Sequence, residues 1–263
     1  MILVAGATGN VGGALVRDLT TRGVPVRGLS RSGEFRADLN DPPSLRPALA
    51  GVSAMFMLAG YPPEIFTEAR QAGVRHVVLM SGGSAETGDR SNAVARYMIE
   101  TEDALRESGL AWTILRPRTF MSNTLQWADQ VRAGVVRAPW PDVAVATVDP
   151  ADIAAVAAVA LTQPGHEGRE YPVTGPEALR PADRVRLLAA ALGREVRYEA
   201  QPDDEARAEM SAQMPKEYVD AFFSFFSDGK LDESQVFPTV AEVTGRAPKT
   251  FEEWAKENAD KFR

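Results

Sequence analysis

Three glycines near the start of the chain have a spacing that suits the binding of a phosphate group. Gly6, Gly9 and Gly12 follow the apolar run 1–5 and precede the helix-like run 13–19. A glycine turn between a strand and a helix lets a ligand approach the backbone, at the positive end of the helix dipole. The alternative is a tight turn that binds nothing, but the order of strand, turn and helix favours a dinucleotide site. The predicted contacts in this turn are Gly6, Thr8, Gly9, Asn10, Val11 and Gly12.

The first half of the chain supplies the elements that would position such a turn. Strand-like and helix-like segments alternate as far as residue 120, which is typical of a parallel sheet with helices on both faces. The predicted strands are residues 1–5, 25–30, 52–58, 75–80 and 112–115, and the later predicted helices are 42–49, 62–72 and 92–108. The fold class is therefore α/β, a Rossmann-type doubly wound parallel sheet that binds ligands at the carboxyl ends of its strands.

Beyond residue 120 the alternation becomes less regular, which indicates a smaller C-terminal α/β lobe. Asp149 as N-cap and Pro150 at the first position predict a helix that ends at Leu161. The other predicted segments are strands over 143–148, 170–174 and 195–199 and helices over 121–132, 180–192, 203–214, 216–226 and 251–262. We expect an NAD(P)-binding Rossmann domain over 1–150 and a substrate-binding lobe over 151–263, partly interleaved with the sheet.

The amino-acid composition excludes several classes of catalytic site and binding partner. The 263 residues include no cysteine and two histidines, which excludes disulfides and thiolate catalysis and argues against a metal site. A formal net charge of −7 argues against nucleic-acid binding. No apolar run has the length of a membrane span and the chain begins with a strand, so we expect a cytoplasmic protein. We also expect a monomer or a homodimer.

The end of the second predicted strand bears on the choice of dinucleotide. NAD sites usually place a carboxylate there to hold the ribose 2′-hydroxyl, whereas this strand leads into Ser30, Arg31 and Ser32. A guanidinium can bind the 2′-phosphate of NADP through two hydrogen bonds. The nearest carboxylate, Glu34, lies beyond Gly33. Arg31 therefore predicts NADP(H) as the cofactor, the alternative being an ordinary solvated arginine.

Several stretches together resemble one family. They are GATGNVGGALVRDL at 6–19, LSRSG at 29–33, ADLNDPPSL at 37–45, VRHVVLMSGGSA at 74–85, ESGLAWTILRPRTFMSN at 107–123 and DPADIAAVAAVAL at 149–161. The chain resembles the atypical short-chain dehydrogenase/reductases, specifically their NmrA-like, NAD(P)H-binding branch. The resemblance covers roughly residues 1–195 and implies a nicotinamide dinucleotide and the reduction of a small carbonyl, quinone or related acceptor. Some relatives are redox-sensing regulators instead.

The resemblance also assigns residues around the cofactor. It implies that Asp38 accepts a hydrogen bond from the adenine and that Leu39 packs on the ring, although Asp38 could simply shape a turn. The small residues Ala59 and Gly60, at the end of the third strand, would lie against the ribose and diphosphate. The remaining predicted contacts are Arg116 and Pro117, beside the nicotinamide, and Ser81 after the fourth strand.

Catalytic groups are harder to assign. Related reductases carry a serine at the position of Ser81, which would polarise the acceptor oxygen, although its hydroxyl could instead bond to the backbone. Their usual proton source is a tyrosine with a lysine four residues later. Tyr97 lies on the corresponding helix, but Thr101 follows at that spacing and residues 92–108 contain no lysine. Tyr97 is therefore either the acid or an aromatic residue of the core or groove.

Two functions remain open. Phe120, Asn123 and Trp127 follow the fifth strand and could line a substrate pocket, although Met and aromatic residues at such spacing often belong to the core. The first function is an NADPH-dependent oxidoreductase acting on a small hydrophobic carbonyl, quinone or related acceptor. The second, suggested by the missing lysine, is a dinucleotide sensor without catalysis that acts through a protein partner.

Overall fold

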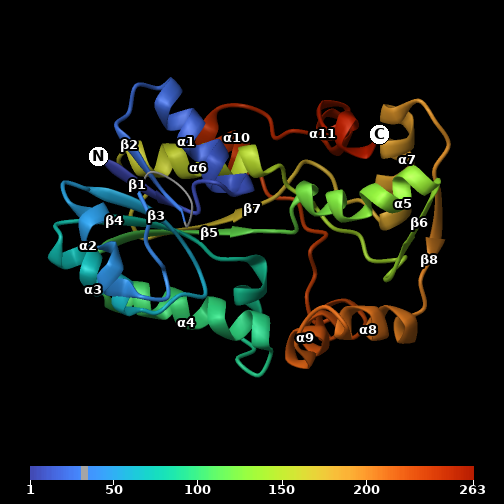
Figure 1. Cartoon of the computed structure of the whole chain (residues 1–263), viewed down its shortest axis with the longest axis horizontal. Helices are drawn as coiled ribbons and strands as arrows, with labels where there is room; N and C mark the ends of the chain where they lie inside the picture. The colour runs from blue at the N-terminus through green and yellow to red at the C-terminus, as the bar shows by residue number, and fades with distance from the viewer. Residues whose placement is uncertain (31–34) are drawn as a thin grey trace.

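The computed structural model describes residues 1–30 and 35–263, and its centre is a sheet of six parallel strands (Figure 1). Their order across the sheet is β2-β1-β3-β4-β5-β7. The strands are β1 Ile2–Ala5, β2 Val26–Leu29, β3 Ala54–Leu58, β4 His76–Met80, β5 Ala111–Pro117 and β7 Arg169–Val173. The order reverses direction between β1 and β3, the point at which doubly wound sheets bind ligands. The predicted Rossmann-type fold is confirmed.

Helices cover both faces of this sheet, because both faces of each central strand are apolar. Ile2 and Val4 of β1 pack on one side, and Leu3 and Ala5 on the other. Figure 1 shows α1, α6 and α10 on the first side and α2, α3 and α4 on the second. These helices are α1 Asn10–Thr21, α2 Arg46–Leu49, α3 Glu64–Gln71, α4 Ala93–Glu107, α6 Pro150–Thr162 and α10 Thr239–Thr244, with 3-10 turns η1 Pro42–Leu45 and η2 Gly83–Thr87.

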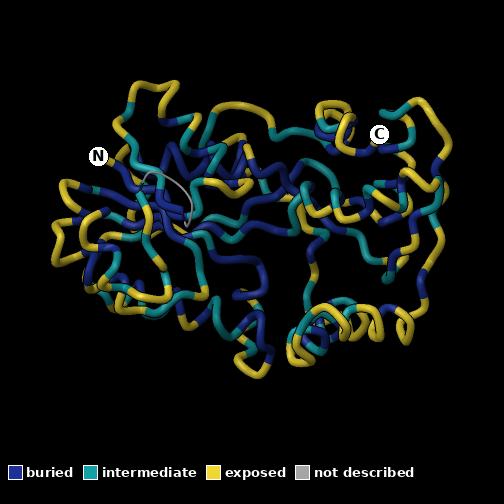
Figure 2. Tube along the Cα trace, viewed as in Figure 1, coloured by how far each residue is buried: buried dark blue, intermediate teal, exposed yellow. Residues whose placement is uncertain are grey.

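A second part of the molecule lies beyond the carboxyl end of β5 (Figure 1). Its core surrounds the parallel strands β6 Val135–Ala138 and β8 Arg197–Ala200. The elements around them are η3 Met121–Trp127, α5 Ala128–Ala133, α7 Pro181–Leu192, α11 Phe251–Glu257 and η4 Ala259–Phe262. Helices α8 Asp203–Ser211 and α9 Lys216–Phe226 form a separate, more exposed pair, whereas the main sheet is buried (Figure 2).

The chain passes between the two parts more than once. Strand β6 precedes residue 150 and belongs to the second part, while α6, β7 and α10 follow it and belong to the sheet layer. The division at residue 150 stays a prediction about folding units. The Asp149 cap of α6 is present, since its carboxylate accepts from the Ala151 backbone N–H at 3.1 Å.

Two local predictions need correction, and two elements were not predicted. Residues 143–148 are not a strand, because Val145 and Val148 make only isolated bridges to Leu179 and Phe120. The pairing strand of this region is β6, which the sequence reading missed together with α10. The helix predicted over 121–132 begins as the 3-10 turn η3 before α5.

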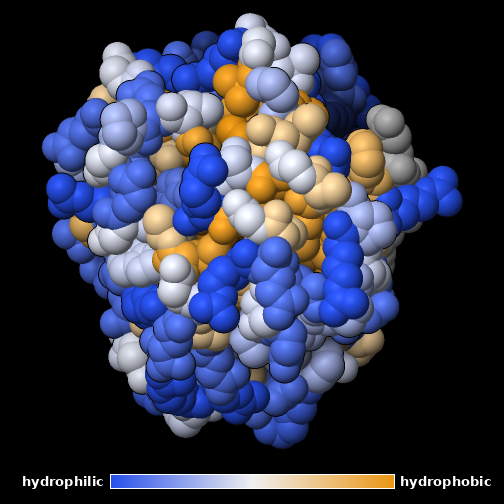
Figure 3. All heavy atoms as spheres, turned by 90° about the vertical axis from the view of Figure 1, so that its left-hand side faces the viewer, coloured by the Kyte–Doolittle hydropathy of each residue, from blue (hydrophilic) through white to orange (hydrophobic). Residues whose placement is uncertain are grey.

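Figure 3 shows the end of the molecule farthest from the second part, where the main sheet and its two helical layers reach the surface. Figure 3 shows apolar atoms through the middle of this face, with hydrophilic side chains bordering them, as expected for a sheet between helical layers. In the part of the chain that the structure describes, no helix combines the length and apolarity needed to cross a membrane.

Candidate active site

The glycine turn between β1 and α1 is built as its spacing predicts. Gly6 has φ +66°, a left-handed conformation that favours glycine. A Cβ on Gly12 would lie 2.2 Å from the carbonyl oxygen of Gly6, so no side chain fits where the helix passes the strand. Gly9 is the N-cap of α1 and has no side chain over the helix end. The turn therefore brings bare backbone to the carboxyl edge of the sheet.

The start of α1 is open to a ligand. Thr8, Gly9 and Asn10 are exposed, while Val11 and Gly12 are buried beneath them. The first turn carries no acidic residue that would repel an anion. The first N–H groups of a helix lack partners within it, and the helix dipole adds positive potential. These residues fit the pyrophosphate of a dinucleotide.

The neighbouring strand ends hold the other predicted cofactor contacts. Asp38 is exposed, and its carboxylate accepts from the backbone N–H of Asn40 at 2.9 Å, which is the turn-forming role. Leu39 is half-buried against the core. Ala59 donates its N–H to the carbonyl of Met80 at 3.0 Å. Arg31, the predicted ligand of the 2′-phosphate, lies outside the described residues.

Gly60 connects the third strand end to Tyr97. Gly60 has φ +91°, and its N–H donates to the Thr101 hydroxyl at 3.1 Å. The Tyr97 ring lies against it, because a Cβ at residue 60 would come within 3.2 Å of the ring. Burial, reinforced by Tyr218, raises the pKa of Tyr97, which makes its phenol a weaker acid. Thr101 donates to the Tyr97 carbonyl at 2.7 Å and so does not replace the missing lysine.

Ser81 follows β4 and is buried at 6% exposure. Its backbone N–H donates to the carbonyl of Leu115 at 2.8 Å. Its hydroxyl lies close enough to the Glu102 carboxylate to help lower the pKa of that group. The geometry is not that of a hydrogen bond, and the hydroxyl has no other hydrogen-bond partner among the described residues. Burial alone would raise the pKa of Glu102, but Arg116, Ser81 and Arg106 together lower it.

Arg116 belongs to this ion-pair network. Its Nε and one terminal nitrogen donate to Glu102 at 3.0 and 2.6 Å, and the other terminal nitrogen lies 2.8 Å from Glu170. All three nitrogens of the guanidinium therefore face carboxylates. Pro117 ends β5 and is buried. Arg116, on β5, thus links α4 and β7 through its ion pairs with Glu102 and Glu170.

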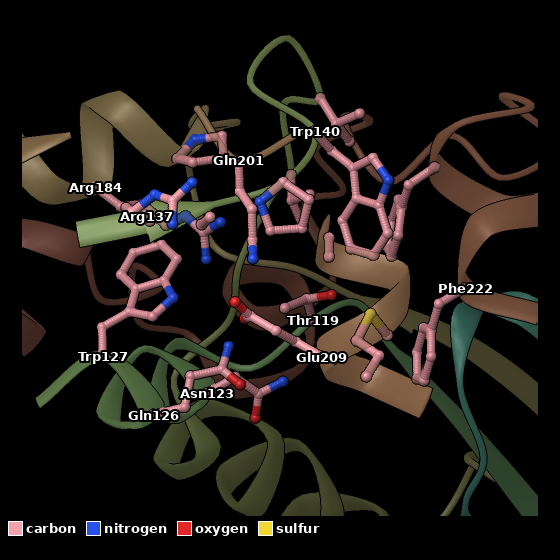
Figure 4. A pocket seen from close by; sticks show the side chains of 18 of the residues that line it. Thr119, Asn123, Gln126, Trp127, Arg137, Trp140, Arg184, Gln201, Glu209 and Phe222 are labelled. Carbon is pink, nitrogen blue, oxygen red and sulfur yellow. The ribbon is translucent and has the colours of Figure 1, made fainter. Parts of the chain in front are cut away.

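A cavity of about 640 Å³ opens beyond the end of β5 (Figure 4). Its walls come from η3, β6, α7, α8, α9 and the loops between them. Ser122, at its rim, accepts a hydrogen bond from the Asn10 side chain at 3.1 Å. The cavity therefore begins next to the glycine turn, where an acceptor would adjoin a bound dinucleotide.

The predicted pocket residues divide between cavity and core. Asn123 and Trp127 line the cavity, whereas Phe120 packs on the core of the sheet layer. Ser81 and Tyr97 are not among the lining residues. On α9, Phe222 and Phe226 face the cavity.

Sequence reasoning missed several lining residues. They include Thr119, Arg137, Arg184, Gln201 and Glu209, which Figure 4 labels. Arg184 had a signal in the sequence, since it stands three residues after Pro181 and four before Leu188, both buried on α7. A charged residue on the buried stripe of a helix indicates a special environment.

Fold and site together define a dinucleotide-binding α/β protein with an adjoining cavity. The sequence profile of the NmrA-like family matches residues 1–255, so the chain belongs to that family, as predicted. The chain is 42% identical to the (4-alkanoyl-5-oxo-2,5-dihydrofuran-3-yl)methyl phosphate reductase of Streptomyces griseus, with 100% of this chain and 99% of that protein covered. It is 38% identical to the NAD(P)H azoreductase of Xenophilus azovorans, with the same coverage.

Solved structures agree in fold. An NADPH-dependent quinone oxidoreductase of Escherichia coli, complexed with NADPH, matches with a TM-score of 0.81 at 24% identity, covering 98% of this chain and 99% of that one. At this identity the likeness concerns the fold. The two sequence relatives are reductases, and with them the predicted class, an NAD(P)H-dependent oxidoreductase, is confirmed.

Proposed function

We propose that the chain uses NADPH to reduce a largely apolar carbonyl, quinone or related acceptor held in the cavity beyond β5. The observation that carries this proposal is the contact between Asn10 and Ser122, which brings the cavity wall to the glycine turn. Trp127, Trp140 and Phe222 supply flat apolar surface for a conjugated acceptor. The names of the two reductase relatives support the same class of reaction.

The chain's own residues would bind the cofactor and supply a proton. NADPH, when bound, supplies the hydride. The glycine turn would hold the pyrophosphate, and Arg31 remains the sequence-based candidate for the 2′-phosphate. Hydride addition to a carbonyl leaves negative charge on its oxygen, so the reaction also needs a proton donor beside the acceptor.

Thr119 and Glu233 form the best-connected proton source at the cavity. Thr119 lines the cavity, and its hydroxyl donates a hydrogen bond to the Glu233 carboxyl at 2.5 Å. Glu233 is 7% exposed, and burial raises its pKa, so the carboxyl keeps its proton to higher pH. In the reactive arrangement the protonated Glu233 carboxyl would donate to the Thr119 oxygen and the Thr119 hydroxyl to the acceptor oxygen. As hydride reaches the acceptor, Thr119 would pass its proton to that oxygen and take the Glu233 proton, and the Glu233 carboxylate would then take up a proton from solvent.

One kinetic series tests the function and the proton source together. The loss of nicotinamide absorbance is followed with a panel of quinones and ketones for the wild type, Thr119→Val, Glu233→Gln, Ser81→Ala and Tyr97→Phe. We expect Thr119→Val to lower kcat about a hundredfold, a general-acid effect, and Tyr97→Phe to change it by less than about threefold. The wild type should lose kcat as the pH rises through the Glu233 pKa, and Glu233→Gln should lack that decline.

The outcomes separate the alternatives. A larger loss in Tyr97→Phe than in Thr119→Val would restore the proton source predicted from the resemblance, and a larger loss in Ser81→Ala would restore the predicted polarising hydroxyl. Tight NADPH binding by the wild type without turnover of any acceptor would favour the sensor. A cytoplasmic location, a monomeric or homodimeric state and the lack of a nucleic-acid partner stay predictions.

A further inference from the structure

Arg184 brings a positive charge to the cavity without an ion-pair partner among the described residues. It lies on α7 beside the buried residues Val185 and Leu188, and its guanidinium lies 4.8 Å from the centre of the Trp127 ring. Its Nε is buried without a hydrogen-bond partner among the described residues, and the Glu233 carboxyl acts on it only from beyond ion-pair distance. Burial lowers the pKa of Arg184 to about 10, which still leaves it charged at neutral pH.

Other arginines of the interior and of the cavity wall are paired with carboxylates. Arg116 faces Glu102 and Glu170, and Arg118 donates to Glu86 at 2.7 Å. Arg137, which also lines the cavity, lies 2.7 Å from Glu205. Arg184 is half-buried as a residue while its Nε is fully buried, and removing a cation from water without a partner is costly unless an anion completes it. Arg184 therefore indicates a ligand rather than a structural role.

The cavity has a polar end and an apolar end (Figure 4). Arg184, Arg137, Trp127 and Gln126 gather at one end, and Trp140 and Phe222 lie at the other. Met210, Met214 and Phe226 add to the apolar lining. Glu209 lies between the ends, where its carboxylate would repel an anion and so favour the Arg184 end for a charged head group.

We propose that the acceptor carries a phosphate monoester, which binds Arg184, and an apolar tail, which lies against Trp140 and Phe222. Guanidinium groups bind phosphate oxygens in pairs through charge-assisted hydrogen bonds, and the ring of Trp127 holds the Arg184 guanidinium in place. The proposal rests on the proposed reductase function. The Streptomyces griseus relative, named for a methyl phosphate ester that carries an alkanoyl group, is consistent with both parts.

Calorimetric binding to the full chain, with NADP⁺ present, tests the subsite without turnover. The probes are n-octyl phosphate, octanoate, 1-octanol and inorganic phosphate. We expect the wild type to bind octyl phosphate at least about tenfold more tightly than octanol, the scale of a charge-assisted hydrogen bond. Arg184→Gln should abolish this preference, and Arg184→Lys should keep part of it. Arg186→Gln is the matched control, because Arg186 lies on the same helix, 68% exposed and outside the cavity lining.

Each contrary result has its own meaning. Octanol binding as tightly as octyl phosphate, or Arg186→Gln acting like Arg184→Gln, would overturn the anion subsite. If octanoate binds as tightly as octyl phosphate, the choice of phosphate as the anion is overturned. If inorganic phosphate binds as tightly as octyl phosphate, the role of the apolar tail is overturned. Thermal unfolding checks that Arg184→Gln is folded, which we expect because the change removes an unpaired charge. If no acceptor is reduced, the reductase proposal fails, while these affinities still report on the subsite.

Discussion

The two ends of the candidate active site are built in different ways. At the glycine turn, backbone groups of one short segment form the surface, and Gly12 is constrained by the Gly6 carbonyl oxygen only 2.2 Å from where its Cβ would lie. At the cavity, side chains from η3, β6, α7, α8 and α9 converge from widely separated parts of the chain. The first end is therefore fixed by local geometry, and the second depends on tertiary packing and can change its ligand by single substitutions.

The largest expected effect concerns the ion pairs that support both ends through β5. Glu102→Gln removes the buried carboxylate that Arg116 and Arg106 share and leaves Arg116 paired with Glu170 alone. We expect the loss of these charge-assisted hydrogen bonds to lower the free energy of unfolding by about 3–5 kcal/mol. Glu100→Gln, exposed on the same helix, is the control. Urea unfolding at neutral pH gives the difference, and equal stability of the two variants would contradict a supporting role.

The same pair of variants has a predictable pH dependence. The folded-state pKa of Glu102 is lowered, so its contribution is present above the unfolded pKa of about 4.5 and is lost as pH falls through the folded value. The stability gap between the wild type and Glu102→Gln should thus narrow below that pH.

A smaller effect separates the two ends directly. Gly12→Ala forces a methyl group onto the Gly6 carbonyl, and we expect about 1–3 kcal/mol of destabilisation from overpacking, together with weaker NADPH binding. Gly13→Ala is the neighbouring control, since the nearest atom to its Cβ would be at 3.3 Å. Fluorescence titration with NADPH measures the affinity. Unchanged binding by Gly12→Ala would show that the turn is structural only.

The smallest effect belongs to the apolar end of the cavity. Phe222→Ala removes a ring that faces the cavity, and we expect KM for an apolar acceptor to rise about tenfold, the scale of a lost aromatic contact, with NADPH affinity unchanged. Phe225 on the same helix is 3% exposed and packs towards α4. Phe225→Leu should therefore lower stability without raising KM. A rise in KM similar to that of Phe222→Ala would contradict the assignment of Phe222 alone to the acceptor site.

This division explains what the sequence could predict. Gly6, Gly9 and Gly12 predicted their own turn, and Asp149 its own cap, because each depends on neighbours along the chain. The place of Arg116 after the fifth strand, with the resemblance, predicted a contact with the nicotinamide, and that contact stays a prediction. Its ion pairs with Glu102 of α4 and Glu170 of β7 are not recognisable in the sequence. Residues 143–148 have the composition of a strand, yet they pair only through isolated bridges. The pairing of Thr119 with Glu233 likewise becomes visible only in the folded chain.

The hydrogen bond from Asn10 to Ser122 also has a thermodynamic meaning. It joins the first residue of α1 to the rim of the cavity, so a ligand that displaces one partner acts on the other. Any change that cofactor binding makes in acceptor affinity must be matched by an equal change in cofactor affinity when the acceptor binds. A single hydrogen bond contributes about 0.5–1.5 kcal/mol, so coupling carried by this contact alone would be roughly two- to tenfold. The two ends, built so differently, would then each report on the ligand bound at the other.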